Sequence, residues 1–409
     1  MRIAITSNGP GEFSGWVRPL VAALLRLAPE TDVSLFFVPD DYATGREAEV
    51  AARLFPSVRI VPPRAYVEFA LGRRIPAVPE AADVVQYLGG DLMHAARVRA
   101  RLGARLRTYK FARRRYARRL ERAYALDAAN ANELVGNRVP RERVAVVGNL
   151  AIDGALAEAS GAFAAGAGCE MIAPDGILIM PGTRKHEVAN LVPLFLQMAL
   201  SIRTRHPDLP IAFALSPFTA HAELARALNG GGHRNVWGAR GRVVSTQAGI
   251  GIQADDGGET FPVVRDAMRH ARSARLAVTL PGTKCIELAA LGVPAIVCVP
   301  LNAPEVVVIN GPLQYLDRLP VVGIPLKRAF VVGVDRRFAV AAQPNIDSGA
   351  MLMPELRGTL MPGEVARRVV AYAADAPALQ TAAQRLRALY ADHIGAAERM
   401  ARSLLSMDA

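Results

Sequence analysis

The chain has 409 residues, of which 51% are hydrophobic and 21% charged. This length exceeds the size at which single hydrophobic cores usually split, so we expect two domains rather than one. The apolar fraction excludes an intrinsically disordered protein, and no apolar stretch reaches the roughly 18 to 20 residues that a membrane-spanning helix needs. The start of the chain lacks the apolar core of a signal peptide, so we expect a cytoplasmic protein.

The formal net charge is +12, which favours a polyanionic partner. The phosphates of a substrate, an anionic membrane surface and a nucleic acid would all meet this description, and charge alone does not distinguish them. The cysteines Cys169, Cys285 and Cys298 are far apart and odd in number. This spacing favours reduced thiols over a disulfide or zinc framework.

The first part of the chain alternates short apolar strands with helices. Residues 2–6 are predicted to form a strand, residues 7–12 a glycine-rich loop and residues 15–27 an amphipathic helix. Further strands are predicted at residues 32–38, 82–87 and 144–147. This alternation is typical of a parallel, doubly wound sheet, which predicts an α/β fold with a Rossmann-like first domain over residues 1–160.

A second domain is predicted because the alternation starts again after residues 153–175, which are rich in alanine and glycine. This second Rossmann-like domain covers residues 175–361. Helical periodicity then extends nearly to the end, so residues 362–409 are predicted to form helices that brace the two domains. The strands expected here are residues 176–180, 211–215, 276–280 and 295–299, and the helices are residues 187–205, 220–228 and 284–291.

Five segments together resemble lipid-A-disaccharide synthase, a glycosyltransferase family with two Rossmann-like domains, known as the GT-B fold. They are residues 11–15 (GEFSG), 147–153 (VGNLAID), 180–184 (MPGTR), Gly282-Thr283 with Glu287, and Pro344-Asn345 with residues 354–356 (PEL). Each segment is weak alone, but their order and spacing match across most of the chain. The sequence departs from the family pattern at Trp16, where the family has aspartate, and near Gly358, where it commonly has glutamine.

The resemblance implies an inverting hexosyltransferase that moves an acylated glucosamine unit from a UDP-sugar donor to a lipid-linked sugar acceptor. It implies no cofactor besides the UDP-sugar co-substrate, and no metal. It also places the enzyme at the inner face of the cytoplasmic membrane, bound to an anionic membrane surface. Nucleic acid is not an expected partner, and a homodimer is left open.

Asp91 is the candidate catalytic base. It follows a predicted strand and Gly89-Gly90, which places its carboxylate at the carboxyl end of a parallel strand, where ligands bind. It also lies where the resemblance places the family's aspartate, and an inverting transfer needs a base for the acceptor hydroxyl. The alternative is that Asp91 only caps the following helix.

The loop after the first strand supplies the candidate acceptor site. Its glycines would let a ligand approach the backbone closely. The resemblance makes Glu12 an acceptor-side residue, although an acidic residue near a helix N-terminus is also favoured by the helix dipole. The predicted acceptor-binding residues are Asn8, Gly11, Glu12 and Ser14.

Two Pro-Gly-Thr loops supply the candidate donor site. Each lies between a strand and a helix, where amides, a hydroxyl and the guanidinium of Arg184 would meet diphosphate oxygens. The resemblance implies that Glu287 holds the ribose hydroxyls. The alternative is a pair of ordinary helix starts. The predicted donor-binding residues are Gly182, Thr183, Arg184, Gly282, Thr283, Glu287, Asn345 and Glu355.

Residues 97–122 are dense in arginine and are interrupted by aromatic residues. This density favours anionic lipid headgroups or a phosphorylated acceptor over nucleic acid, with a solvated helix face as the alternative. Residues 66–75 mix apolar residues with arginine, as a patch at a membrane interface would.

Two rival functions stay open. One is a UDP-sugar 2-epimerase of the same GT-B architecture, which would bind the same donor without a lipid acceptor. The other is a non-catalytic nucleotide-sugar or lipid-binding protein that has kept the fold.

Overall fold

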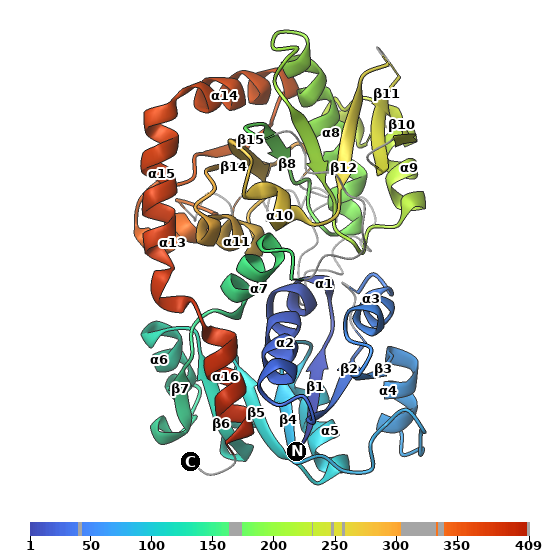
Figure 1. Cartoon of the computed structure of the whole chain (residues 1–409), viewed down its shortest axis with the longest axis vertical. Helices are drawn as coiled ribbons and strands as arrows, with labels where there is room; N and C mark the ends of the chain where they lie inside the picture. Colours follow the sequence, from blue (N-terminus) through green and yellow to red (C-terminus); the bar gives the residue numbers. More distant parts are fainter. Residues whose placement is uncertain are drawn as a thin grey trace. The chain divides into compact units, whose positions relative to one another are not determined.

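The computed structural model describes residues 1–39, 43–162, 174–230, 232–246, 249–255, 258–303, 333 and 339–406. The chain forms two compact α/β units, each built around its own sheet (Figure 1). The first unit comprises Met1–Ala157 with Tyr390–Ala409, and the second comprises Glu158–Leu389. The predicted fold class of two doubly wound α/β domains is therefore confirmed.

Within the described residues, the first unit holds a sheet of seven parallel strands in the order β3-β2-β1-β4-β5-β6-β7. The strands are β1 (Arg2–Ser7), β2 (Asp32–Phe37), β3 (Arg59–Val61), β4 (Val84–Tyr87), β5 (Arg105–Tyr109), β6 (Leu120–Ala125) and β7 (Val144–Val146). Only the first residue of β1, β2 and β5 is exposed, and β4 is buried throughout. Helices cover both faces of such a sheet, which explains the apolar sequence of its central strands.

The helices of the first unit include one contiguous helical segment after β1, which consists of α1 (Pro10–Glu12), the π-helical turn η1 (Phe13–Val17) and α2 (Arg18–Leu27). The others are α3 (Glu47–Leu54), α4 (Pro63–Ala70), α5 (Leu92–Leu102), η2 (Ala117–Arg119), α6 (Ala128–Gly136), η3 (Arg141–Arg143), α7 (Leu150–Ala159), η7 (Ala391–His393) and α16 (Ala396–Leu405). The first helix thus begins at Pro10, five residues before the predicted start. Proline suits the first helical position, because its fixed φ matches the helix and its missing N–H is not needed there.

The arginine-dense residues 97–122 are partly internal. They include β5 and the start of β6, where the buried guanidinium of Arg107 lies 2.7 Å from the Glu121 carboxylate and donates to the Ser403 carbonyl at 2.7 Å. Burial alone would raise the pKa of Glu121, but hydrogen bonds and charge from Arg107 and Arg105 hold it below its usual value. Part of this charge is therefore used inside the fold.

The second unit has a mixed sheet in the order β10-β11-β12-β9-β8-β13-β14-β15, with eight strands in the described ranges. They are β8 (Ile177–Ile179), β9 (Ile211–Ala214), β10 (Gly241–Thr246), β11 (Gly249–Ala254), β12 (Thr260–Val264), β13 (Leu276–Thr279), β14 (Ala295–Pro300) and β15 (Glu355–Gly358). The pairs β10–β11 and β11–β12 are antiparallel and the other pairs are parallel. Strands β10 and β11 were not predicted, because their polar and glycine residues interrupt the apolar run of a buried parallel strand.

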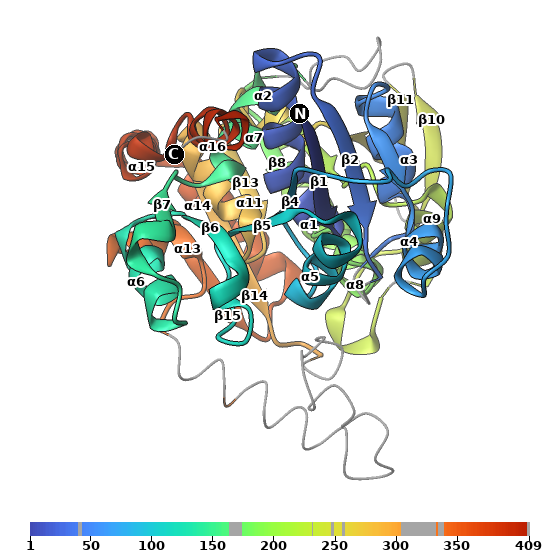
Figure 2. The ribbon, with the colours of Figure 1, turned by 90° about the horizontal axis from the view of Figure 1, so that it is seen from below.

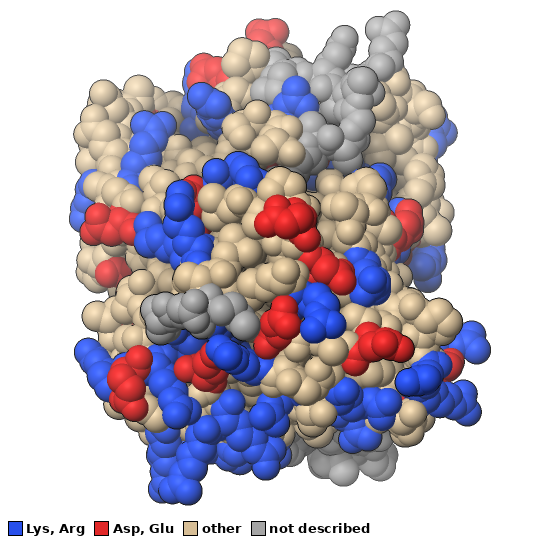
Figure 3. Space-filling model, turned by 60° about the horizontal axis from the view of Figure 1, so that its bottom comes forward, with Lys and Arg blue, Asp and Glu red and all other residues tan. Residues whose placement is uncertain are grey.

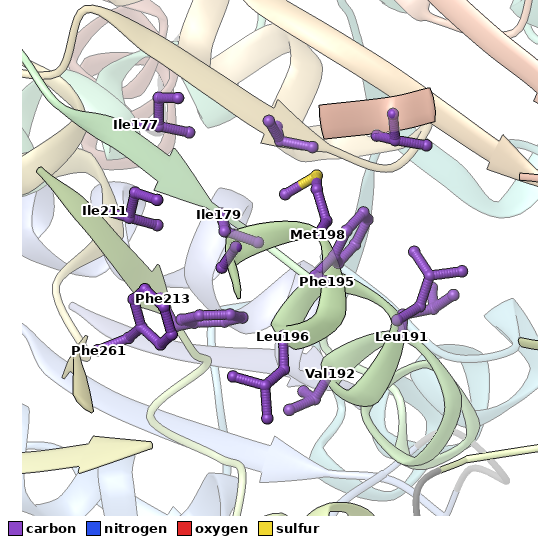
Figure 4. Packing of buried hydrophobic residues seen from close by; sticks show 14 of the residues in the cluster. Ile177, Ile179, Leu191, Val192, Phe195, Leu196, Met198, Ile211, Phe213 and Phe261 are labelled. Carbon is purple, nitrogen blue, oxygen red and sulfur yellow. The ribbon is translucent and has the colours of Figure 1, made fainter. Parts of the chain in front are cut away.

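The helices of the second unit include α8, α9, α14 and α15, which share one apolar core with the sheet. The bounds of its helices are α8 (Lys185–Arg203), α9 (His221–Gly230), η4 (Arg234–Val236), α10 (Ala267–Ala271), α11 (Thr283–Leu291), α13 (Gln343–Ser348), α14 (Pro362–Ala374) and α15 (Ala376–Leu389). Figure 4 shows Phe195 and Met198 of α8 facing the strand residues Ile179 and Phe213. All four side chains are buried, and burial of each contributes about 1.5 to 3 kcal/mol to folding.

The C-terminal helices are divided between the units. Helices α14 and α15 belong to the second unit, whereas α16 returns to the first and packs on α2 (Figures 1 and 2). Asp153 of α7 holds the start of α16, because its carboxylate accepts from the Gly395 amide at 2.8 Å and the Ala397 amide at 2.6 Å. The conspicuous Asp153 of the segment 147–153 therefore has a structural role.

We expect Asp153→Ala to lower the free energy of unfolding of the first unit by about 1 to 3 kcal/mol, because two backbone donors lose a charged acceptor. Urea denaturation measures this change. The matched control is Asp392→Ala, which removes an exposed carboxylate from η7, just before α16, and should change the value by less than about 0.5 kcal/mol. Equal effects of the two substitutions would contradict the assignment.

Candidate functional site

In the first unit, β1 and β4 are neighbours from which the strand order runs in opposite directions. In open parallel sheets, ligands bind beyond the carboxyl ends of the strands at such a switch point. The segment that follows β1 contains Asn8, Gly11, Glu12 and Ser14, and the loop that follows β4 contains Asp91. The topology therefore brings the predicted acceptor residues and the predicted base to one edge.

These two segments are in close contact. A Cβ atom at Gly89 would lie 2.5 Å from Asn8 Oδ1 and 3.1 Å from the Cβ and Cγ atoms of Glu12. Gly90 has φ +81, and a Cβ there would lie 2.5 Å from a methyl group of Val38. Side chains larger than hydrogen are excluded at both positions, so the glycine pair is what lets Asn8 and Glu12 pack against the loop.

Asp91 caps a helix, which was the alternative to a catalytic role in the sequence analysis. It is the N-cap of α5, and its Oδ1 accepts from the Met93 amide at 2.8 Å. Its Oδ2 lies 2.8 Å from Nη2 of Arg113, and its side chain is 33% exposed. The carboxylate thus caps a helix, carries an ion pair and still reaches solvent, and a catalytic role for it stays a prediction.

Two ionisable groups beside Asp91 were not among the predicted residues. The Tyr87 hydroxyl donates to the Gly90 carbonyl at 2.7 Å, and burial together with the charges of Glu12 and Asp91 raises the pKa of Tyr87. His94 lies one helical turn after Asp91, and burial lowers its pKa, opposed in part by the Asp91 charge. The spacing from Asp91 to His94 was the only sequence signal for this neighbour.

His94 is held in place by Tyr66. The Tyr66 hydroxyl and His94 Nδ1 are 2.6 Å apart, and burial raises the pKa of Tyr66 to about 12. The edge of the first sheet therefore combines carboxylates, a histidine whose neutral form is favoured, and two tyrosines that keep their protons at neutral pH.

In the second unit, the strand order reverses at β8 and β13, and the two Pro-Gly-Thr loops follow these neighbouring strands. The loop after β8 is closed by a side chain of its own helix. Glu187 Oε2 accepts from the amides of Thr183 at 2.8 Å and Arg184 at 3.0 Å. The amides predicted to meet a diphosphate are therefore already hydrogen-bonded, and the space above Gly182 is filled, since a Cβ there would lie 2.4 Å from Glu187 Oε2.

The loop after β13 is open. Gly282 is the N-cap of α11 with φ +149, and among the described residues no atom lies within 4 Å of where its Cβ would be. Thr283 is exposed beside it, and Glu287 is buried on the same helix in an ion pair with Lys284. The structure therefore provides an accessible helix N-terminus here, with Arg184, whose side chain is 51% exposed, following the neighbouring strand.

Asn345 and Glu355 contact each other, but both are directed inward. Asn345 Nδ2 donates to Glu355 Oε1 at 2.9 Å and to the Met353 carbonyl at 2.8 Å. The Glu355 side chain is 1% exposed and also accepts from the amides of Ala341 at 2.9 Å and Ala342 at 2.8 Å. Their hydrogen bonds hold the segment before α13 against β15, and a donor-binding role for either stays a prediction.

Solved structures resemble this chain over nearly its whole length, although no family model and no curated relative matches it. A candidate UDP-N-acetylglucosamine 2-epimerase from Listeria monocytogenes has a TM-score of 0.59 at 13% identity, covering 100% of this chain and 97% of that one. MnaA of S. aureus with UDP has a TM-score of 0.57 at 12% identity, covering 98% and 95%. UDP-GlcNAc 2-epimerase from Neisseria meningitidis, bound to UDP-GlcNAc, has a TM-score of 0.54 at 10% identity, covering 99% and 100%.

These likenesses establish the GT-B-like fold, and they correct the expected family. The resemblance to lipid-A-disaccharide synthase was wrong, and with it the predicted hexosyltransferase activity and role in lipid A synthesis, because the matching structures are UDP-GlcNAc 2-epimerases. The physical reason lies in the motifs, which are glycine-rich turns at the ends of parallel strands. Such turns are required wherever a ligand approaches a doubly wound sheet, whatever reaction follows.

In the part of the chain that the structure describes, every helix is too short or too polar to cross a membrane. The same residues contain no group of three or more His, Cys, Asp and Glu side chains that could hold a metal ion. The expected absence of a metal stays a prediction.

We expect Gly89→Ala to destabilise the first unit by about 1 to 3 kcal/mol, because the new methyl group would overlap Asn8 and press on Glu12. Thermal or urea unfolding measures the loss. Gly136→Ala is the matched control, since no described atom lies within 4 Å of its added Cβ. A Gly89→Ala protein as stable as this control would show that the two segments are not in close contact.

Proposed function

We propose that the chain binds a UDP-sugar and acts as a sugar-nucleotide 2-epimerase, inverting the configuration at C2 of the sugar. The observation that carries this proposal is the likeness in fold, over both units and nearly all residues, to two proteins described as UDP-GlcNAc 2-epimerases and to S. aureus MnaA. Two of these were solved with UDP or UDP-GlcNAc bound. A lipid acceptor is not needed for this reaction.

The open loop after β13 is the proposed contact for the diphosphate. A helix N-terminus carries partial positive charge and attracts phosphate oxygens, and Gly282 leaves room for close approach. The exposed guanidinium of Arg184, after the neighbouring strand β8, adds a charged donor. The loop after β8 contributes the Arg184 side chain rather than backbone amides, because the amides of Thr183 and Arg184 already donate to Glu187.

The edge of the first sheet is the proposed source of acid and base groups. Inversion at C2 requires that the C2 proton be removed and that a proton be returned from the other face. Asp91 and Glu12 are carboxylates at this edge, and Tyr87 and His94 lie beside Asp91. We assign the base to Asp91, because its carboxylate lies at the end of the central strand β4 and reaches solvent.

Substitution at Gly282 tests the diphosphate contact. We expect Gly282→Ala to weaken UDP binding at least about tenfold, because the methyl group occupies space that no described atom fills. Isothermal titration with UDP measures the change. Gly258→Ala is the control, since this glycine also has positive φ and an open Cβ position but lies in the turn between β11 and β12. Unchanged UDP affinity of Gly282→Ala would remove this loop from the site.

Substitution of Asp91 separates its two roles. Asparagine caps helices as well as aspartate does, so Asp91→Asn should keep the stability of α5 and reduce epimerisation by about 10²-fold or more. Proton NMR of UDP-GlcNAc and its C2 epimer measures the rate. Arg113→Ala is the control that removes the closer of the two arginines paired with Asp91, Arg113 at 2.8 Å and Arg115 at 3.8 Å, but keeps the carboxylate. Full activity of Asp91→Asn would rule out Asp91 as the base.

The predicted contact with an anionic membrane remains a proposal that rests on one surface. Leu71 is 74% exposed and Val67 39% exposed at the end of α4, and Arg73 beside them is 72% exposed. Basic side chains are clustered on the face seen in Figure 3. Cosedimentation with vesicles of phosphatidylglycerol and phosphatidylcholine tests this, and Leu71→Asp should reduce binding to the anionic vesicles. Equal sedimentation of both proteins would exclude this surface.

A further inference from the structure

The turn after β5 is held in an uncommon backbone conformation. Lys110 has φ +67, and the Phe111 amide donates to the Tyr109 carbonyl at 2.7 Å, which makes a three-residue turn with a left-handed centre. Turns of this kind are rare, because a side chain at positive φ is strained by about 1 to 3 kcal/mol. Such strain persists only where other interactions fix the conformation.

Those interactions come from neighbouring elements. The Lys110 amide donates to the Tyr124 carbonyl at 2.8 Å, and the Lys110 carbonyl accepts from Asn130 Nδ2 at 3.0 Å. The Thr108 hydroxyl donates to the Phe111 carbonyl. Strand β6 and helix α6 thus lock the turn, and the direction of the two side chains at its tip is fixed.

The turn presents its side chains to Trp16. The Lys110 ammonium lies 5.7 Å from the centre of the Trp16 ring and 5.4 Å from that of Phe111, and the two rings are 6.2 Å apart. Tyr109 supports Trp16 from one side, with its ring in an edge contact at 5.6 Å. Tyr109 is fully buried, and its hydroxyl accepts from the Leu150 amide at 2.9 Å, so this support is rigid.

Trp16 itself comes from the π-helical turn η1, in which the Arg18 amide bonds to the Phe13 carbonyl. Turns of this type inside α-helices often occur at functional sites. Glu12 precedes Trp16 on the same helical segment, and Arg113, two residues after the turn, lies 2.8 Å from the Asp91 carboxylate. Trp16, Lys110 and Phe111 therefore lie at the same sheet edge as the carboxylates of Glu12 and Asp91.

We propose that Trp16, Lys110 and Phe111 form a wall against which the sugar ring of the substrate lies, which rests on the proposed function. Phe111 is 43% exposed and Trp16 is half-buried, so ring surface remains accessible to a ligand. A pyranose has C–H groups that pack on aromatic rings and hydroxyls that accept from an ammonium. Two aromatic rings with one ammonium beside them therefore fit the sugar ring of the substrate.

The sequence provides a direct probe, because it contains only two tryptophans. In a Trp237→Phe protein, Trp16 is the single tryptophan, and its fluorescence should change when UDP-GlcNAc is added but not when UDP is added. Trp16→Ala and Phe111→Ala should each raise the Kd for UDP-GlcNAc about tenfold, a loss of about 1.4 kcal/mol. The Kd for UDP should stay within twofold of the wild-type value, because UDP lacks the pyranose ring that makes this contact.

Three controls separate the outcomes. Trp237→Phe alone should bind both ligands as the wild type does. Circular dichroism checks that each variant is folded. If Trp16→Ala does not fold, Phe111→Ala still tests the site. Wild-type protein that binds neither ligand overturns the proposed function and this site with it. Binding of UDP-GlcNAc by the wild type that both substitutions leave within twofold overturns this site alone. An equal response of Trp16 to UDP would assign the wall to the nucleotide instead.

Discussion

The arrangement of every candidate group depends on one constraint, the burial of the central parallel strands in each unit. Strands covered by helices on both faces have little room for polar chemistry along their length, so polar side chains collect beyond the strand ends. In the first unit, the ends of β1 and β4 bring Glu12 next to the Gly89-Gly90-Asp91 loop. In the second, the ends of β8 and β13 bring two loops of nearly the same sequence side by side.

The two Pro-Gly-Thr loops show that a local contact can make one copy of a motif accessible to a ligand and the other inaccessible. Both follow a strand and share the residues Pro-Gly-Thr, with Met180 and Arg184 on either side in one and Leu280 and Lys284 in the other. In the first loop, Glu187 reaches back to two amides and fills the space above Gly182. In the second, Glu287 pairs with Lys284 and leaves Gly282 open. The two loops also enter their helices differently, since α8 begins at Lys185 and α11 at Thr283. The first loop is thus closed by its own helix, and the second is open to an anion.

The sequence predicted the architecture well because its main signal is apolar periodicity. The predicted strands 2–6, 32–38 and 144–147 agree with β1, β2 and β7 to within one residue at each end. Strands β5 and β6 were missed because arginines interrupt them, and the burial of Arg107 depends on Glu121 and Ser403, a partner almost 300 positions away in sequence. The inward roles of Asp153, Asn345 and Glu355 were equally hidden, since a polar residue near the start of a helix or strand has the same sequence pattern whether it binds a ligand or a backbone amide.

Function was harder to predict than fold, because the motifs that suggested a transferase are requirements of the sheet edge. Close contacts explain the glycines at residues 89 and 90, and the positive φ of +149 explains Gly282. An epimerase removes the proton on C2 of the sugar and returns one, whereas a transferase leaves that proton in place. The most direct measurement is therefore proton NMR of UDP-GlcNAc incubated with the protein in D2O. The epimerase account predicts that deuterium replaces hydrogen at C2 as the second epimer forms. The account would be contradicted if the substrate is consumed while the C2 proton stays in place. It would also be contradicted if the C2 proton of UDP-GlcNAc is still in place after prolonged incubation.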